Sequence, residues 1–168
     1  MMKKTLSDNE ATRLALANRL FFRLYQCANM LHKTGTRAIE AHGLTTQQWA
    51  VLGALSRPQV DDGMKLGDLA RYLMVSRQNL SGVVGRLERD GHVTSIPDPN
   101  DRRSRLIHMT ASGREVWLVH AVPLIAEYYE AALEGFGVND MVHTVHYLLR
   151  ILENMRRLDT ASDDAGEP

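Results

Sequence analysis

Apolar residues recur at every third or fourth position in two long stretches of the chain, and this spacing predicts amphipathic helices. In the first stretch, residues 11–41, the apolar stripe comprises Leu14, Ala17, Phe21, Leu24, Ala28 and Leu31. In the second, near the C-terminus, a coiled-coil-like seam comprises Met141, Val145, Leu148, Leu152 and Met155. One small domain cannot bury both stripes, so we expect them to pair with a second copy in a symmetric homodimer.

Between these stretches the pattern predicts three shorter helices. Thr45, followed three residues later by Gln48, forms a capping-box sequence that starts the first of them. The other two span residues 66–74 and 76–90, with a tight turn between them, and Gly91 ends the last. A helix, a tight turn and a second helix in this order are typical of a helix-turn-helix.

Two β-prone runs follow, at residues 92–96 and 105–109. The sequence between them, Pro-Asp-Pro-Asn-Asp, is dense in turn formers, so the unit is predicted to be a β-hairpin. A helix then restarts near residue 110, and Pro123 is expected to kink or split it. The expected fold class is mainly α with a small β-hairpin wing: a winged helix-turn-helix flanked by N- and C-terminal dimerisation helices.

Four segments follow from this order of elements. Residues 1–43 form an N-terminal dimerisation helix, and residues 44–114 form the winged helix-turn-helix. Residues 115–158 form the C-terminal dimerisation helices. The last ten residues, 159–168, are small, polar and acidic, and we expect a disordered tail there.

Charge is concentrated in the winged segment. The chain holds 20 Lys and Arg against 20 Asp and Glu. Residues 65–114 nevertheless carry nine basic and five acidic residues, a net charge of +4, which the rest of the chain balances. A basic module in a neutral chain is typical of a protein that binds nucleic acid, although charge alone also fits an ordinary solvated surface.

Other classes of protein find little support in the sequence. The single cysteine, Cys27, excludes an internal disulfide framework and fits a reducing compartment. No signal peptide follows the basic start, and the longest apolar run is too short to span a bilayer, so we expect a cytoplasmic protein without membrane contact. No nucleophile–base pair, phosphate loop or clustered metal-ligand motif is present, so we expect no catalytic residue, cofactor or metal.

The helix over residues 76–89 has two distinct faces. Leu80, Val84 and Leu87 cluster on one face, and polar residues and two glycines occupy the other. We predict a recognition helix whose DNA-binding residues are Ser76, Arg77, Gln78, Asn79, Ser81, Gly82 and Arg86. Gly82 and Gly85 cost a helix about 1 kcal/mol each relative to Ala, which suggests that bulk is excluded there so that DNA can approach. An ordinary surface helix is the alternative.

The predicted hairpin carries a second set of candidate DNA-binding residues. Asp101, Arg102, Arg103 and Arg105 lie at or beside its tip. Arginines on an exposed turn suit phosphate neutralisation and insertion into the minor groove. We expect Asp101 to orient one of the guanidinium groups through a charge-assisted pair.

These motifs resemble the MarR family of bacterial regulators. The resemblance is carried by LTTQQWAVLGALSRP at residues 44–58 and by MKLGDLARYLMVSRQNLSGVVGRLERDGHVTSIPDPNDRRSRLIHMTASG at residues 64–113. Asp101-x-Arg103 followed by Thr110-x-x-Gly113 is similar to the wing signature of the family. The resemblance implies that residues 76–82 read the major groove, that Arg103 enters the minor groove, and that an effector pocket lies between each DNA-binding lobe and the dimer interface.

A candidate effector site lies on the first helix. Phe21, Tyr25 and His32 share one face, and Trp49 of the second helix could close a pocket there. Two aromatic rings and an imidazole suit a flat ligand that carries an acidic group. The alternative is that these residues are dimer core.

The sequence therefore predicts a homodimeric transcription regulator, specifically a repressor that a small aromatic or anionic ligand releases from a palindromic double-stranded DNA operator. A redox-responsive regulator acting through Cys27, a ligand-independent DNA-binding protein, and a helical enzyme or adaptor remain alternatives. In the redox-sensing branch of the MarR family the reactive cysteine corresponds to Phe21 here, six residues earlier, so we expect Cys27 to be a buried structural thiol.

Overall fold

The computed structural model describes residues 7–60 and 62–164, except for the side chains of Arg102 and of residues 160–164. Residues 1–6, 61 and 165–168 lie outside the described part. The chain forms two compact units. The first ends at Tyr128, and the second begins at Tyr129.

The first unit begins with α1, Asp8–Ile39. Ser7 and Glu10 form a capping box at its start, in which the Ser7 amide donates to Glu10 Oε2 at 2.8 Å and the Glu10 amide donates to Ser7 Oγ at 3.3 Å. The helix ends in a short 3₁₀ turn, η1 (Glu40–His42). Of its residues only Gly35 and Ile39 are buried, so α1 is anchored to the rest of the unit by its C-terminal end.

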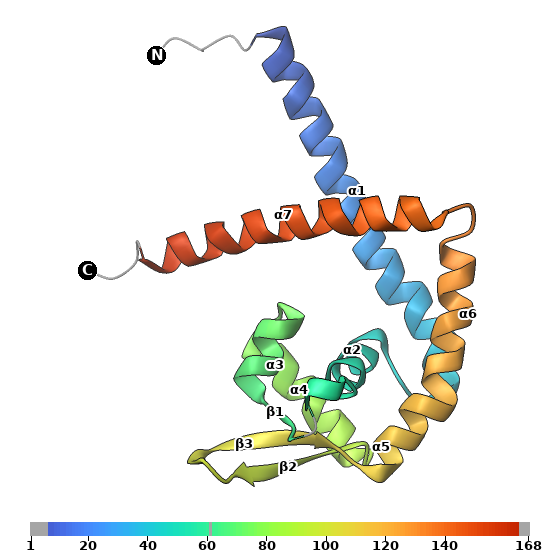
Figure 1. Cartoon of the computed structure of the whole chain (residues 1–168), viewed down its shortest axis with the longest axis vertical. Helices are drawn as coiled ribbons and strands as arrows, with labels where there is room; N and C mark the ends of the chain where they lie inside the picture. Colours follow the sequence, from blue (N-terminus) through green and yellow to red (C-terminus); the bar gives the residue numbers. More distant parts are fainter. Residues whose placement is uncertain (1–6, 61, 165–168) are drawn as a thin grey trace. The chain divides into compact units, whose positions relative to one another are not determined.

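Three helices form the centre of this unit: α2 (Thr46–Leu55), α3 (Leu66–Leu73) and α4 (Arg77–Arg89). A short 3₁₀ turn, η2 (Pro58–Val60), follows α2. The Thr45–Gln48 capping box is confirmed, and Ser76 caps α4 by accepting from the Asn79 amide at 3.2 Å. These helices gather beside the sheet in Figure 1. Their inward side chains form the core, whose fully buried members include Leu44, Val51, Leu52, Leu69, Leu80 and Leu87.

The wing is a three-stranded antiparallel sheet in the order β1-β3-β2. Its strands are β1 (Met64–Lys65), β2 (Val93–Asp98) and β3 (Asp101–Met109). The predicted hairpin is thus present, but β1 was not predicted, because two residues are too few to show an alternating pattern. The turn is also narrower than the predicted residues 97–101, since Pro97 pairs with Arg105 across the ladder and an irregularity follows it.

After the wing, α5 (Ala111–Glu115) continues into η3 (Val116–Ala121), a π-helical segment, and then into α6 (Val122–Ala132). Pro123 was expected to kink or split this helix. The helix instead widens into π turns directly before the proline, which lacks an N–H and whose ring would clash with the carbonyl four residues earlier in a regular α-helix. The widened segment buries Trp117 and Ala121.

The second unit contains α7, Val138–Asp164. The predicted seam lies on this helix, and Val145, Leu148 and Met155 remain 43–55% exposed in the single chain. A disordered tail was predicted for residues 159–168, but α7 continues to Asp164, so the first part of that segment is helical. Helical hydrogen bonding therefore persists beyond the last apolar residue of the stripe, and residues 165–168 lie outside the described part.

Gly113 and Gly85 provide a matched pair for testing the packing around the wing. A Cβ at Gly113 would lie 1.9 Å from the carbonyl oxygen of His92, whereas a Cβ at Gly85 would meet no atom within 4 Å. We expect Gly113→Ala to lower the free energy of unfolding by about 2–3 kcal/mol through overpacking. Gly85→Ala should raise it by about 0.5–1 kcal/mol through helix propensity. Urea unfolding measures both, and an unchanged midpoint for Gly113→Ala would contradict the packing.

Candidate nucleic-acid interface

The two faces of α4 are as predicted. Leu80, Val83, Val84 and Leu87 are buried, each at most 5% exposed. The predicted DNA-binding residues of this helix are all exposed, namely Ser76, Arg77, Gln78, Asn79, Ser81, Gly82 and Arg86. Because the apolar face is fixed in the core, the polar face is presented to solvent in one orientation.

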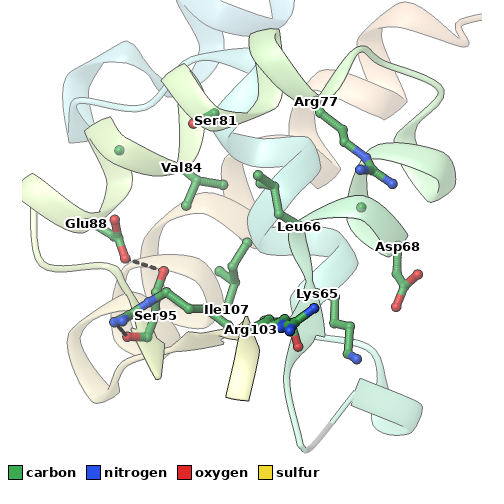
Figure 2. Close-up of a pocket in the computed structure, with 14 residues that line it drawn as sticks. Lys65, Leu66, Asp68, Arg77, Ser81, Val84, Glu88, Ser95, Arg103 and Ile107 are labelled. Atoms are coloured by element: carbon green, nitrogen blue, oxygen red, sulfur yellow. Dashed lines mark hydrogen bonds between the residues drawn. The ribbon is translucent and has the colours of Figure 1, made fainter. Parts of the chain in front are cut away.

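A groove of about 550 Å³ lies between α3, α4 and the wing. Figure 2 shows Arg77 and Ser81 on the helical side of this groove and Arg103 on the wing side. Arg105 and Lys65 also line it, so the groove brings four cations together with two acids, Asp68 and Glu88. It is the candidate DNA-binding surface, and we call it the DNA-facing groove. It gathers Arg77, Ser81, Arg103 and Arg105 from the predicted set, whereas the remaining predicted residues lie outside its lining.

Asp98 holds the turn of the wing together. Its carboxylate is only 4% exposed, although it lies in a surface hairpin. It accepts hydrogen bonds from Lys65 Nζ at 2.9 Å, from the Asn100 amide at 2.8 Å and from Ser104 Oγ at 3.0 Å. These donors come from β1, the turn and β3. In the sequence Asp98 is one of several turn formers, and the spacing of the chain does not indicate Lys65 as its partner.

The hydrogen bonds at Asp98 shift the pKa of both members of the ion pair. The Lys65 ammonium, followed by the Asn100 amide, lowers the pKa of Asp98 below its ordinary value of 3.8. The Asp98 carboxylate correspondingly raises the pKa of Lys65 above 10.5. Because the pKa of Asp98 is lowered on folding, its contribution to the free energy of unfolding is lost as pH falls below 3.8. Because the pKa of Lys65 is raised on folding, its contribution is lost as pH rises above 10.5. The pair therefore contributes fully to stability between these values.

Among the described side chains, Asp101 does not form the expected charge-assisted pair with Arg103 or Arg105. Its Oδ1 accepts from the backbone amide of Arg103 at 3.1 Å, and its Oδ2 lies 3.6 Å from Lys65 Nζ. Asp101 thus shapes the backbone before the arginine instead of pairing with the guanidinium of Arg103 or Arg105. The geometric reason is that an aspartate reaches the amide two residues ahead more easily than it reaches a long side chain. The side chain of Arg102 lies outside the described part.

A chain of hydrogen bonds joins α4 to the wing. Arg105 Nη2 donates to the Ser95 carbonyl, and Ser95 Oγ donates to Glu88 Oε1 (Figure 2). These residues belong to β3, β2 and the last turn of α4. Ser95 and Glu88 were not predicted from the sequence, because their proximity depends on strand register.

The candidate effector residues are not equally placed. Trp49 is half-buried, and its ring packs edge-on against Tyr128 with centroids 6.2 Å apart. Thr34 Oγ1 lies 2.9 Å from the hydroxyl of Tyr128, so this cluster joins α1, α2 and α6. Phe21, Tyr25 and His32 are exposed along α1. To enclose a ligand together with Trp49, these three residues would need other side chains to cover the exposed face of α1.

Three other expectations concern single features of the chain. Cys27 is exposed, so the expected burial of its thiol is wrong for the single chain, because nothing in the first unit covers that face of α1. Among the described residues there is no group of three or more His, Cys, Asp or Glu that could hold a metal ion. Within the same residues, no helix has the length and apolarity that crossing a membrane requires.

Comparison with known proteins identifies relatives along the whole chain. A model of the MarR family matches residues 42–104. The transcriptional activatory protein BadR of Rhodopseudomonas palustris is 68% identical over 166 residues, which cover 98% of this chain and 94% of that protein. The homoprotocatechuate degradative operon repressor of Escherichia coli is 30% identical over 128 residues, or 75% of this chain and 84% of that protein.

Solved structures share the fold. The Staphylococcus aureus MepR–DNA complex matches with a TM-score of 0.71 at 19% identity, covering 80% of this chain and 96% of that one. CouR from Rhodococcus jostii, bound to p-coumaroyl-CoA, matches with a TM-score of 0.68 at 24% identity, covering 82% and 93%. Both likenesses concern the arrangement of helices and wing.

The role of Asp98 predicts a distinct response to acid. Asp98→Asn removes the charge that Lys65 stabilises, so we expect a lower urea midpoint at about pH 7 and a smaller loss of stability on acidification to about pH 3 than in the unmodified protein. Asp90→Asn is the matched control, since Asp90 is exposed. Its one described ion pair is with Arg89, whose Nε lies 3.8 Å from Asp90 Oδ1. Identical pH dependence of Asp98→Asn and the unmodified protein would show that the ion pair does not hold the wing.

Proposed function

This chain belongs to the MarR family of DNA-binding transcription regulators, and from that premise we propose that it binds a palindromic operator as a homodimer under the control of a small aromatic acid. The MarR family is not a family of enzymes, so the activity is binding. The observation that carries the proposal is the DNA-facing groove, which Arg77 and Ser81 line from α4 and Arg103 and Arg105 line from the wing.

In this proposal α4 and the wing bind different parts of the duplex. Gln78 and Ser81 lie on the exposed face near the start of α4, where a recognition helix meets base edges in the major groove. Gly82 and Gly85 leave that face without bulk. Arg103, at the start of β3, neutralises phosphate or enters the minor groove. Support for this assignment comes from the charge of the groove and from the shared fold of MepR, whose structure contains DNA.

Activation is the direction of control that we favour. The sequence led us to expect a repressor, and the E. coli relative at 30% identity is named as one. The relative at 68% identity, which covers nearly the whole chain, is named an activatory protein. Because the same dimer on DNA can block or recruit polymerase according to where the operator lies, we give more weight to the relative of higher identity. A promoter–reporter fusion distinguishes the two directions.

The ligand is proposed to be an aromatic acid. The name of the E. coli relative places it in control of an operon that degrades an aromatic acid, and CouR is bound to an aromatic thioester. Trp49 is the candidate effector residue that is already part of a packed cluster. Phe21, Tyr25 and His32 would complete the site only if a second copy covers the exposed face of α1.

Two substitutions should weaken DNA binding in different ways. Arg103→Ala should reduce affinity for many sequences and lower the salt slope by about 1, since the arginine is assigned to the phosphate backbone or the minor groove. Gln78→Ala should cost about 1–3 kcal/mol at one base position. Fluorescence anisotropy on matched and mismatched duplexes at several salt concentrations measures both. Arg37→Gln, on the exposed side of α1, is the control, and normal binding by Arg103→Ala would contradict the wing assignment.

The exposed apolar faces predict the oligomeric state. Light scattering at micromolar concentration should give a mass about twice the 18.9 kDa of one chain, because α1 and the seam of α7 leave apolar side chains uncovered. Leu148→Glu on that seam should shift the mass toward 18.9 kDa. A monomer at these concentrations would contradict both the homodimer and recognition of two half-sites about 34 Å apart.

A further inference from the structure

A second cavity lies away from the residues of α1 that were expected to bind a ligand. It has a volume of about 160 Å³ and is bordered by the end of α2, the loop before β1, the end of β3 and the α5–η3 helix. Its apolar lining includes Leu55, Met109 and Trp117. A cavity of about 150 Å³ is large enough to bind benzene, so this one has room for a single aromatic ring.

Two arginines border this cavity, and each is held in place by the protein. Arg57 Nε donates to the Ala54 carbonyl at 3.1 Å, and the guanidinium carbon lies 3.8 Å from the centre of the Tyr72 ring. Arg114 Nη1 donates to the Met109 carbonyl at 2.9 Å. These contacts use only part of the five donors on each guanidinium and restrict its motion.

The charge of the cavity is not balanced from within. Among the side chains that the structure describes, no carboxylate lies within 4.0 Å of either guanidinium. His108 also lines the cavity, and its Nε2 atom is buried without a hydrogen-bond partner among the described residues. Buried polar atoms are nearly always paired, so this wall has unused capacity for hydrogen bonding. An anion would supply the missing partner for the two arginines.

We propose that this cavity binds a small aromatic carboxylate, with the acid on Arg57 and Arg114 and the ring against Trp117 and Met109. The inference rests on the proposed control by an aromatic acid, and it places that ligand inside one chain. It therefore differs from the site at Phe21, Tyr25, His32 and Trp49, which needs a second copy.

The cavity is connected to the DNA-facing groove through β3. Ile107, only 2% exposed, borders both hollows. The same strand carries Arg103 and Arg105 on its way to the tip of the wing. A ligand in the cavity would thus contact the strand that positions these arginines. By linkage, any change that the ligand causes in DNA affinity must be matched by an equal change in ligand affinity caused by DNA.

Calorimetric titration of the full chain tests the charge requirement. We expect homoprotocatechuate to bind and its uncharged methyl ester to bind at least about tenfold more weakly. Arg114→Gln and Arg57→Lys should each weaken binding of the acid at least about tenfold, because both remove a fixed guanidinium donor. Arg37→Gln, a guanidinium outside the cavity, should leave it unchanged. Equal affinity of the acid for all three variants overturns the site.

The two tryptophans of the chain make the location testable by fluorescence. Trp49→Phe leaves Trp117 as the reporter in the cavity, and Trp117→Phe leaves Trp49 at the α1 site. We expect phenylacetate to change the emission of Trp117 and the change to disappear when Arg114→Gln is added. A response of Trp49 alone keeps the ligand control of the proposed function but overturns this cavity.

Operator binding without ligand separates the remaining outcomes. If neither homoprotocatechuate nor phenylacetate binds the unmodified protein at about 10 mM, the cavity proposal is overturned whatever the protein does with DNA. If the acids bind in the cavity but the unmodified protein binds no palindromic duplex, the proposed operator function fails and the cavity stands.

Discussion

The wing depends on one nearly buried carboxylate. A charge that is removed from water must be compensated by donors, and Asp98 receives them from β1, from the turn and from β3. The same three hydrogen bonds close the turn to two residues, recruit the short strand β1 and define where β3 begins. Since Arg103 lies at the start of β3, the position of this proposed DNA contact follows from the hydrogen bonds of a carboxylate that is itself nearly buried.

The DNA-facing groove also contains an acid whose presence needs an explanation. Glu88 lies among four cations, where a carboxylate would repel phosphate. Its hydrogen bond from Ser95, and the bond from Arg105 to the Ser95 carbonyl, give it a structural role that links α4 to both long strands. Glu88 thus lowers the net positive charge of the groove, and in return its hydrogen bond fixes the position of α4 relative to the wing.

The sequence was most informative where the chain is periodic or where a local rule applies. The faces of α4 follow from the 3.6-residue period, and the caps at Thr45 and Ser76 follow from hydrogen bonds over three residues. The strand β1, the partner of Asp101 and the link through Ser95 could not be predicted in this way, because they join residues that only the folded register brings together. The π turns before Pro123 show a similar limit, since a proline indicates an interruption but not the form it takes.

The contact between His92 and the helix after the wing has a mechanical consequence. The His92 carbonyl accepts from both the amide and the hydroxyl of Thr110, and Gly113 lies so close to it that no side chain fits between them. The start of β2 and the start of α5 are therefore joined without slack. A rotation of α5 that preserves these contacts would therefore carry the first residues of β2, and with them the base of the wing, in the same direction.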